Sequence, residues 1–455
     1  MMTMNPPVAV SAALPRPIAA RRSAPAAGVA ALTVVMILFF VMALVAAYTN
    51  RSLVFEQRVA TNSYRSARAI ESAEAGLEWT VAMLNGGRID NNCKPSDVAA
   101  DSDFRRRYLL DLVDPSIAEG SYGFTWAANP PRMFPACITR AGVLQCICPT
   151  PVTRNPAMTA EADGSGSAFR IQLELPGSEP RSGLTGVIAL GCANPGSGAL
   201  SCYAQQNTDE LGSADAAARA QINVGLLRAL PLAPVAALTA GGTVSVTAGS
   251  ILTVSNSSNN AALTVHAGNL PLPPSAAMAL TGPAGSASDG LLRDSNLSDL
   301  AAAPNELWFS SLFAIDPVNF AALPATRTVA CAAGGCVSND LTTTLANFPR
   351  NPVLVAGNLT LDGGGALGTA ADPVLLIVRG ILTISSNVTL NGLVQADSVV
   401  WASPATVQGA LVTTGNFAAS TNATLTYRQD LLDTIRLRYG SFLRVPGSWK
   451  QRTQN

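Results

Sequence analysis

The sequence is poor in the side chains that most enzymes use for catalysis. Its 455 residues include one histidine, His266, and two lysines, Lys94 and Lys450. A zinc site with two histidines on one helix is therefore excluded, and neither lysine follows the glycine that a P-loop requires. Triad chemistry would have to use His266, but the alternating residues 263–267 predict a strand in which this histidine is structural or exposed. We therefore expect a protein that is not an enzyme and that has no cofactor or metal.

Charged residues are scarce as well. They make up 13% of the chain, against about 25% in typical globular proteins. The 29 basic and 29 acidic residues give a net charge of zero, which argues against strong binding of nucleic acid or anionic lipid. One basic cluster, Arg105-Arg106-Arg107, lies in a predicted short helix over residues 97–113. We interpret it as a solvated helix face, with a nucleic-acid patch as the alternative.

A long apolar stretch near the N-terminus predicts a membrane-spanning helix. Residues 26–48 contain no charged side chain, and a helix of about 20 apolar residues crosses the hydrocarbon core of a bilayer. Arg16, Arg21 and Arg22 precede the stretch, which places the N-terminus in the cytoplasm and the rest of the chain outside. A cleavable secretory signal is the alternative, but this stretch exceeds the roughly 7–15 apolar residues of a signal core.

The helical pattern continues beyond the apolar stretch. No proline occurs from Ala26 to Lys94, and apolar residues recur at helical spacing up to Leu84. This stripe consists of Leu53, Ala60, Tyr64, Ala67, Ile70, Ala73, Leu77, Val81 and Leu84. Asn85-Gly86-Gly87 would end the helix. We therefore predict a helix over residues 29–85 that is amphipathic in its second half, where a folded domain must cover the stripe.

Residues of this helix resemble a known family. The segment Glu56-Gln57-Arg58-Val59-Ala60-Thr61-Asn62, with Arg65 and Ala73-Glu74-Ala75-Gly76-Leu77, is similar to PilX-type minor pilins, which are type IV pilus assembly proteins with a PilX N-terminal region. The resemblance covers about residues 22–85. At the other end, Tyr439-Gly440-Ser441-Phe442 and residues 444–449 are similar to the C-terminus of larger proteins of this type.

The resemblance implies a cytoplasmic leader, residues 1–28, that prepilin peptidase removes by cutting between Gly28 and Val29. It implies a single-pass protein of the bacterial inner membrane that enters the pilus, with other pilins and pilus assembly proteins bound through the helix. Pilins commonly carry Glu at the fifth mature position, where this chain has Thr33. A carboxylate buried in the membrane is functional in such proteins, so its absence points to a minor subunit, a tip subunit or an unprocessed anchor.

The cysteines indicate disulfides. All eight follow the apolar stretch, as expected for a domain exported to an oxidising compartment. Their spacing predicts two local pairs, Cys192–Cys202 and Cys331–Cys336. The remaining four would share two bonds whose connectivity stays open: Cys93, Cys137, Cys146 and Cys148. A metal site built from the last three of these is the alternative.

The part of the chain after the helix is predicted to be mostly β, so the fold class is α+β. We expect an irregular disulfide-containing region over residues 86–230 and a charge-poor, β-rich region over 231–350. Residues 351–428 carry short strands with Gly-Asn turns, typical of a β-solenoid, although a β-sandwich fits nearly as well. The charge-free stretch 229–288 would add coils to that stack or pack against it. Residues 429–455 form a final helix and tail, and we expect the helix to cap the open end of the stack.

Three classes of function are compatible with these features. The first is a minor pilin-like structural subunit, whose helix enters the membrane and then the pilus core while the β-rich body lies outside. The second is a pilus-tip adhesin or surface-binding module. The third is an enzyme with a carboxylate-only site such as a glycosidase pair, but the strands over residues 374–428 hold only one acidic residue, Asp397. We favour the first.

Overall fold

The computed structural model describes most of the chain from residue 27 to residue 453. The described ranges are 27–111, 122–123, 134–149, 166–174, 183–193, 216–258, 263–269, 276–282, 290–303 and 306–453. The chain divides into two compact units after Ser63. We refer to the second unit, from Tyr64 onwards, as the body.

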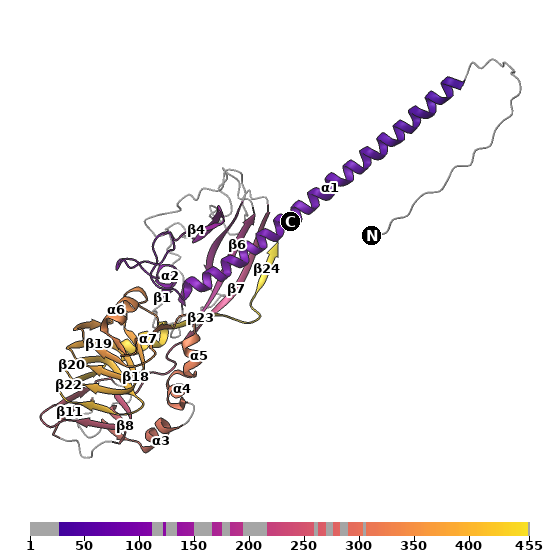
Figure 1. Ribbon diagram of the computed structural model, residues 1–455. Coiled ribbons are helices and arrows are strands. Elements are labelled where there is room, and N and C mark those ends of the chain that lie inside the picture. Colours follow the sequence, from indigo (N-terminus) through magenta and orange to yellow (C-terminus); the bar gives the residue numbers. More distant parts are fainter. Residues whose placement is uncertain are drawn as a thin grey trace, which may run out of the picture. The chain divides into compact units, whose positions relative to one another are not determined.

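Helix α1 runs without interruption from Ala27 to Leu84 (Figure 1), close to the predicted span of 29–85. Its part before Tyr64 belongs to the first unit. From Ala31 to Ser63 every side chain of this part is exposed, and the first charged residue is Arg51. By length and composition, the described part of α1 is able to cross a membrane.

In the body, an antiparallel sheet packs against the outer part of α1, and we call it the head sheet. Its described strands are β3 (Ala136–Arg140), β4 (Val143–Ile147), β5 (Ser167–Glu174), β6 (Leu184–Ala193), β7 (Ala216–Arg228), β23 (Gly440–Arg444) and β24 (Lys450–Thr453). The order is β4-β3-β5-β6-β7-β23, and β24 also pairs with β7. The chain therefore leaves the head sheet after β7 and returns to it only at its end (Figure 1). A short helix, α2 (Phe104–Tyr108), and a two-stranded pair, β1 (Leu110–Asp111) with β2 (Tyr122–Gly123), complete this region.

Small residues bring α1 and the head sheet close together. The buried face of the helix consists of Ala69, Ser72, Ala73, Gly76, Leu77, Thr80 and Leu84. On the sheet side, a Cβ placed on Gly191 would lie 2.2 Å from the carbonyl oxygen of Ala69. The predicted stripe was right at Ala73, Leu77 and Leu84, but four of its members are exposed: Leu53, Ala60, Tyr64 and Ala67. Hydrophobicity alone missed the small and polar members of the face because close packing, not apolar area, selects them.

The second sheet of the body contains fifteen described strands, and every pairing within it is parallel. We call it the parallel stack. Its strands are β8 (Ala236–Val246), β9 (Leu252–Ser255), β10 (Leu263–Asn269), β11 (Met278–Thr281), β12 (Leu291–Arg293), β13 (Arg327–Val329), β14 (Cys336–Val337), β15 (Val353–Val355), β16 (Leu359–Leu361), β17 (Gly365–Leu367), β18 (Val374–Ile384), β19 (Val388–Trp401), β20 (Ala405–Thr413), β21 (Phe417–Ala419) and β22 (Ala423–Tyr427). This parallel pairing differs from the antiparallel pairing of a β-sandwich.

The layers of the parallel stack do not follow chain order. One apolar ladder runs through Val353, Leu376, Val394, Leu411, Leu238, Val265 and Leu291. The strands β8 to β12 therefore extend the stack beyond β20 and β22, although they precede these strands in the sequence (Figure 1). The charge-free stretch 229–288 thus contributes further layers, one of the two expected alternatives. The structure consequently joins the expected regions 231–350 and 351–428 in one sheet, and it returns residues 440–453 to the head sheet.

Helices lie along the sides of the parallel stack. They are α3 (Ser295–Ala302), α4 (Leu307–Phe313), α5 (Pro317–Ala322), α6 (Ser338–Asn347) and α7 (Gln429–Arg438). The expectation that the last helix caps the open end of the stack was wrong. Helix α7 contacts β19 and β20 in the middle of the stack, and the strand that covers β22 is β9. Strand β9, an earlier segment of the chain, already pairs with the strand before α7. Helix α7 therefore packs against the side of the parallel stack instead.

Three disulfides join described cysteines. Cys93 bonds to Cys148, and Cys137 bonds to Cys146 across the β3–β4 hairpin. The third joins Cys331 to Cys336 in the parallel stack. All three members of the suggested metal site are thus disulfide-bonded. The predicted Cys192–Cys202 pair includes Cys202, which lies outside the described residues.

Loss of the Cys331–Cys336 bond is expected to have a moderate effect. The bond closes a loop with a sequence separation of 5, so the chain-entropy model assigns it about 2 kcal/mol. The double variant Cys331→Ser/Cys336→Ser should therefore lower the free energy of unfolding by about that amount in urea titrations under oxidising conditions. An unchanged unfolding midpoint would show that the disulfide does not restrict the unfolded chain as this model assumes.

Candidate functional site: the exposed helix and its anchor

The exposed part of α1 carries a long run of exposed apolar side chains, from Leu32 to Val59. Leu38, Phe39 and Phe40 are 54%, 75% and 66% exposed, and their neighbours are similar. Gly28 and Val29, between which the leader would be cut, lie in the first turn of α1. Thr33, at the expected fifth mature position, has an exposed side chain on the next turn. A soluble monomer rarely exposes an apolar surface of this extent, so this part of α1 is suited to lipid or to other helices.

At its other end α1 is anchored by buried hydrogen bonds. Arg105 of α2 is 5% exposed. Its guanidinium donates from Nε to the carbonyl oxygen of Leu84 and from Nη2 to Asn85 Oδ1 at 3.2 Å and to the Gly440 oxygen at 2.8 Å. The Asn85 side chain exchanges two hydrogen bonds with the backbone of Phe442, at 2.8 and 2.9 Å. Arg105 therefore satisfies the carbonyl of Leu84 at the end of the helix, which has no partner within the helix, and its positive charge complements the helix dipole.

The parallel stack contacts the same helix end. Arg327 of β13 donates to the carbonyl oxygen of Asn85, as does Asn351 Nδ2 at 3.3 Å. The Arg88 amide donates to the Asn347 oxygen at 2.8 Å. Burial lowers the pKa of Arg327, whose guanidinium also lies 4.4 Å from the centre of the Phe348 ring. Helix α1, the head sheet and the parallel stack thus meet at the single turn that follows Leu84.

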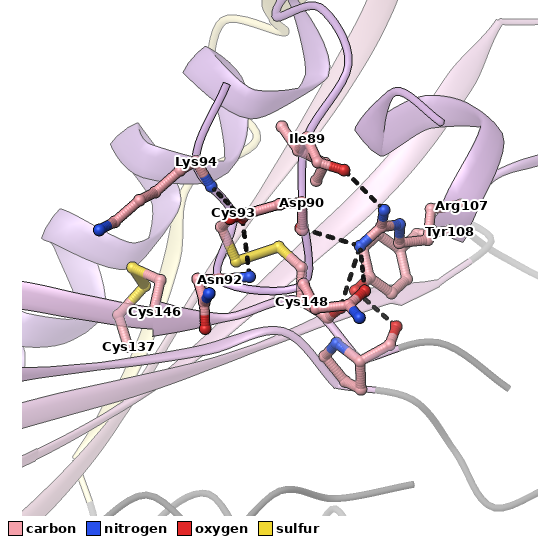
Figure 2. Close-up of a disulfide and its surroundings, with 12 residues drawn as sticks. Ile89, Asp90, Asn92, Cys93, Lys94, Arg107, Tyr108, Cys137, Cys146 and Cys148 are labelled. Carbon is pink, nitrogen blue, oxygen red and sulfur yellow. Dashed lines mark hydrogen bonds between the residues drawn. A yellow bond between two sulfur atoms is a disulfide. The ribbon is translucent and has the colours of Figure 1, made fainter. Parts of the chain in front are cut away.

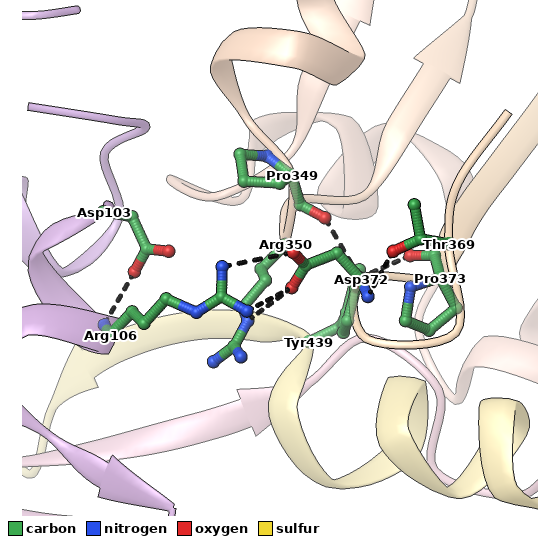
Figure 3. A network of polar contacts seen from close by, with 8 residues as sticks. All are labelled: Asp103, Arg106, Pro349, Arg350, Thr369, Asp372, Pro373 and Tyr439. Atoms are coloured by element: carbon green, nitrogen blue, oxygen red, sulfur yellow. Dashed lines mark hydrogen bonds and ion pairs between the residues drawn. The ribbon is translucent and has the colours of Figure 1, made fainter. Parts of the chain in front are cut away.

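A second contact between α2 and the parallel stack is centred on Asp372 (Figure 3). Arg106 donates to both carboxylate oxygens of Asp372 at 3.2 Å, and Arg350 Nε donates to one of them at 3.2 Å. Tyr439 lies beside this cluster and donates to the carbonyl oxygen of Pro349 at 3.0 Å. Burial raises the pKa of Tyr439, so its hydroxyl stays protonated as a donor. Arg106 is 40% exposed. This contact therefore lies at the rim of the joint, by which we mean the region after Leu84 where α1, the head sheet and the parallel stack meet.

The third arginine of α2 holds the loop of the Cys93–Cys148 disulfide (Figure 2). Arg107 donates to the carbonyl oxygens of Ile89 at 2.7 Å, Asp90 at 3.1 Å and Cys148 at 3.0 Å. The adjacent Tyr108 donates to the Pro149 oxygen at 2.9 Å. Arg107 therefore ties the loop after α1 to the segment after β4.

The interpretation of Arg105-Arg106-Arg107 as a solvated helix face was wrong for Arg105, which is buried, and for Arg107, which is half-buried, whereas Arg106 is exposed. Each arginine bonds to a different part of the body, so the cluster does not form a free basic patch. Consecutive residues of a helix point in different directions, about 100° apart, which lets three neighbours reach three partners. The sequence carried no signal for these partners, because Gly440 and Asp372 lie hundreds of residues away.

The single histidine was expected in a strand, as a structural or exposed residue. His266 lies in β10, as expected for a strand residue, with Nε2 3.4 Å from Asp294 Oδ2. Within the described ranges, no group of three or more His, Cys, Asp or Glu side chains could hold a metal ion.

The described chain thus has a long helix that is apolar at its start and packed on an antiparallel sheet at its end. Residues 27–78 match the family model named PilX N-terminal. The resemblance seen in the sequence is thereby confirmed for this helix: residues 27–78 are of the PilX N-terminal type. A search of the curated proteins found no match.

Two solved structures are similar over parts of the chain. The competence-associated pilin ComZ from Thermus thermophilus is 11% identical, with 86% of this chain and 98% of that chain covered and a TM-score of 0.22. The DUF3494 domain of ice-binding protein 1 from Shewanella frigidimarina is 18% identical, with 44% of this chain and 98% of that chain covered and a TM-score of 0.21. At such TM-scores neither likeness bears on the function of this chain.

Proposed function

We propose that the protein is a minor pilin-like structural subunit that takes part in type IV pilus assembly. The first half of α1 inserts in the inner membrane with its N-terminus in the cytoplasm, and later enters the helical core of the pilus. The body stays outside the membrane and is displayed on the filament. The protein acts by assembly and carries out no catalysis.

The continuity of α1 carries this proposal. One helix has a fully exposed apolar start, which needs lipid or partner helices, and a buried end, which is fixed to the body. Transfer of this apolar surface from water into lipid or a helix bundle is favourable by roughly 25 cal/mol per Å² of apolar area buried. A mature start at Val29 would leave Thr33 where other pilins have a carboxylate, which suits a subunit used in small numbers. The PilX N-terminal match supports the same assignment.

Processing by prepilin peptidase can be tested at the proposed cleavage position. We expect Gly28→Val to block removal of the leader, so that the membrane-extracted protein keeps residues 1–28. Ala27→Val, which introduces the same side chain at the preceding position, is the control and should be processed. N-terminal sequencing and intact mass decide between the possibilities. A natural start at Tyr48 would indicate an ordinary secreted protein, and an uncut N-terminus a fixed membrane anchor.

The pilus assignment and the adhesin alternative predict different results on deletion of the gene. A structural subunit should co-purify with sheared filaments, and its loss should reduce their number. A tip adhesin would leave the filaments intact and abolish attachment. An unprocessed membrane-anchored protein would remain in the membrane fraction after shearing.

A further inference from the structure

The edge of the head sheet at β4 lacks the protection that the other edge of this sheet has. Among the described strands, β4 pairs only with β3, and its residues 143–147 include no charged side chain. Val143 and Leu144 are 61% and 46% exposed. An exposed, uncharged edge is open to pairing with another chain, and charged side chains are a common protection against it. The strands at the other edge, β23 and β24, carry such charges: Arg444, Lys450 and Arg452.

The backbone of β4 presents hydrogen-bonding groups to this open edge. The Cα atoms of Cys137 and Cys146 lie 4.0 Å apart, the short separation of an antiparallel pair that exchanges no hydrogen bonds. Cys146 therefore turns its N–H and C=O away from β3. Leu144, two residues earlier in the strand, does the same because the pattern alternates. These four groups are the ones to which an added strand would bond.

A groove of about 740 Å³ follows the same edge and is lined by residues from both faces of the sheet. On the face that packs against α1, its lining includes Leu144, Cys146 and Trp79. Successive side chains of a strand point to opposite faces, so Val143 and Gln145 line the groove from the other face. An extended peptide has the same alternation, and along β4 it would place its side chains in both halves of the groove.

The aromatic residue of the groove is held in position by its neighbours. The ring of Trp79 packs edge-on against Phe104, with 5.6 Å between the ring centres, and its centre lies 5.7 Å from that of Phe169. A partly buried aromatic ring that is already fixed loses little conformational entropy when a partner covers it. Trp79 is therefore suited to receive an apolar side chain.

The charge of the groove favours an acidic partner. Lys94 and Arg140 line it and are exposed, and the described lining residues include no Asp or Glu. Lys94 extends toward the side on which Cys146 lies (Figure 2). A second copy of this chain is disfavoured, because pairing of two β4 edges would bring the cations of both copies together.

We propose that β4 binds an extended segment of a partner protein, which joins the head sheet as a further strand. Main-chain hydrogen bonds to Leu144 and Cys146 hold the segment. One of its apolar side chains covers Trp79, and a carboxylate of the segment pairs with Lys94. The proposal does not depend on the pilus assignment.

The test measures binding of labelled peptides to the full-length protein in detergent by fluorescence anisotropy. The peptides have about seven residues, close to the usual length of a strand, with Val, Leu or Phe alternating with Thr. One library carries Asp at a Thr position, and a matched library carries Lys there. We expect saturable binding of Asp peptides, and binding about tenfold weaker or absent for their Lys counterparts.

Methylation of the peptide amides tests whether the segment binds as a strand. Only every second N–H of an added strand faces β4. Methylation of one alternate set of amides in the best Asp peptide should therefore abolish binding, whereas methylation of the other set should be tolerated. Equal loss from both sets, or from neither, would overturn addition of a strand.

Two variants of the protein locate the site. Lys94→Glu should weaken binding of the Asp peptide about tenfold or more. Lys450→Glu is the matched control, because Lys450 is the other lysine of the chain and is exposed in β24 at the opposite edge. Leu144→Pro removes an outward N–H but no bond to β3, which an edge strand tolerates, and it should also weaken binding. If Leu144→Pro fails to fold, the comparison of the two lysine variants decides.

Several results would overturn the proposal. They are absence of saturable binding by every Asp peptide, equal binding of the Lys peptides, and equal weakening by Lys94→Glu and Lys450→Glu. Sedimentation of the protein alone examines the remaining occupant. A dimer that is lost in Leu144→Lys would assign the edge to a second copy of this chain, and this result would also overturn the proposal.

Discussion

Replacing Arg105 with alanine is expected to lower the free energy of unfolding of the body by about 4 kcal/mol or more. The substitution removes the guanidinium of a residue that is 5% exposed. The carbonyl oxygens of Leu84 and Gly440 lose this donor, and Asn85 Oδ1 keeps only the Phe442 amide. Hydrogen bonds to charged groups contribute about 1.5–3 kcal/mol each, and buried acceptors left unpaired are costly. Urea unfolding of the detergent-solubilised protein, followed by tryptophan fluorescence, measures the change.

The neighbouring arginine is the matched control. Arg106 is 40% exposed and pairs with Asp372 at the rim of the joint, where an ion pair contributes about 0–1 kcal/mol. Arg106→Ala should therefore change stability far less than Arg105→Ala, although both variants remove the same side chain from the same helix. Equal effects of the two substitutions would contradict the anchoring role assigned to Arg105.

The second large effect is expected at the contact between α1 and the head sheet. A Cβ at position 191 would lie 2.2 Å from the Ala69 carbonyl oxygen and 2.3 Å from the Ala73 amide nitrogen. Both atoms belong to the backbone of a helix, so no side-chain rotation relieves the overlap. Gly191→Ala should therefore separate helix and sheet and cost about 3 kcal/mol or more, at the upper end for overpacked cores. Thermal unfolding with circular dichroism detection measures this loss.

Gly334→Ala is the comparison for that experiment. No atom lies within 4 Å of a Cβ built at Gly334, so the same chemical change meets open space. We expect its thermal midpoint to stay close to that of the original protein. If Gly191→Ala were equally harmless, the close packing of α1 on β6 would not hold in solution.

The sequence was most informative where structure depends on neighbouring residues. The apolar stretch, the absence of proline and the stop at Asn85-Gly86-Gly87 together predicted α1 almost to its ends. The short strands between residues 353 and 427 were likewise visible in their alternation and Gly-Asn turns. These are local properties, set by helix and strand periodicity, and they need no knowledge of distant partners.

The joint at the end of α1 could not be predicted, because its partners are remote in the chain. Asn85 bonds to Phe442, and Arg106 bonds to Asp372. Nothing in the pattern around Arg105 separates an arginine that is buried against carbonyls from one that faces water. The position of α7 was missed for a related reason, since only the full topology shows that β9 already covers β22. These positions depend on hydrogen bonds and strand pairings between residues that are far apart in the chain. A single sequence gives no sign of which distant residues will pair.

The return of the chain to β7 has a consequence for biogenesis. Strand β7 pairs along its outer edge with β23 and β24 among the described strands, and both follow it in the chain by more than the whole length of the parallel stack. Until they arrive, β7 presents an open edge and Arg105 lacks its acceptor at Gly440. The head sheet is therefore complete only after residues 440–453 have been synthesised, and a chain that stops before them would leave this edge of β7 unpaired.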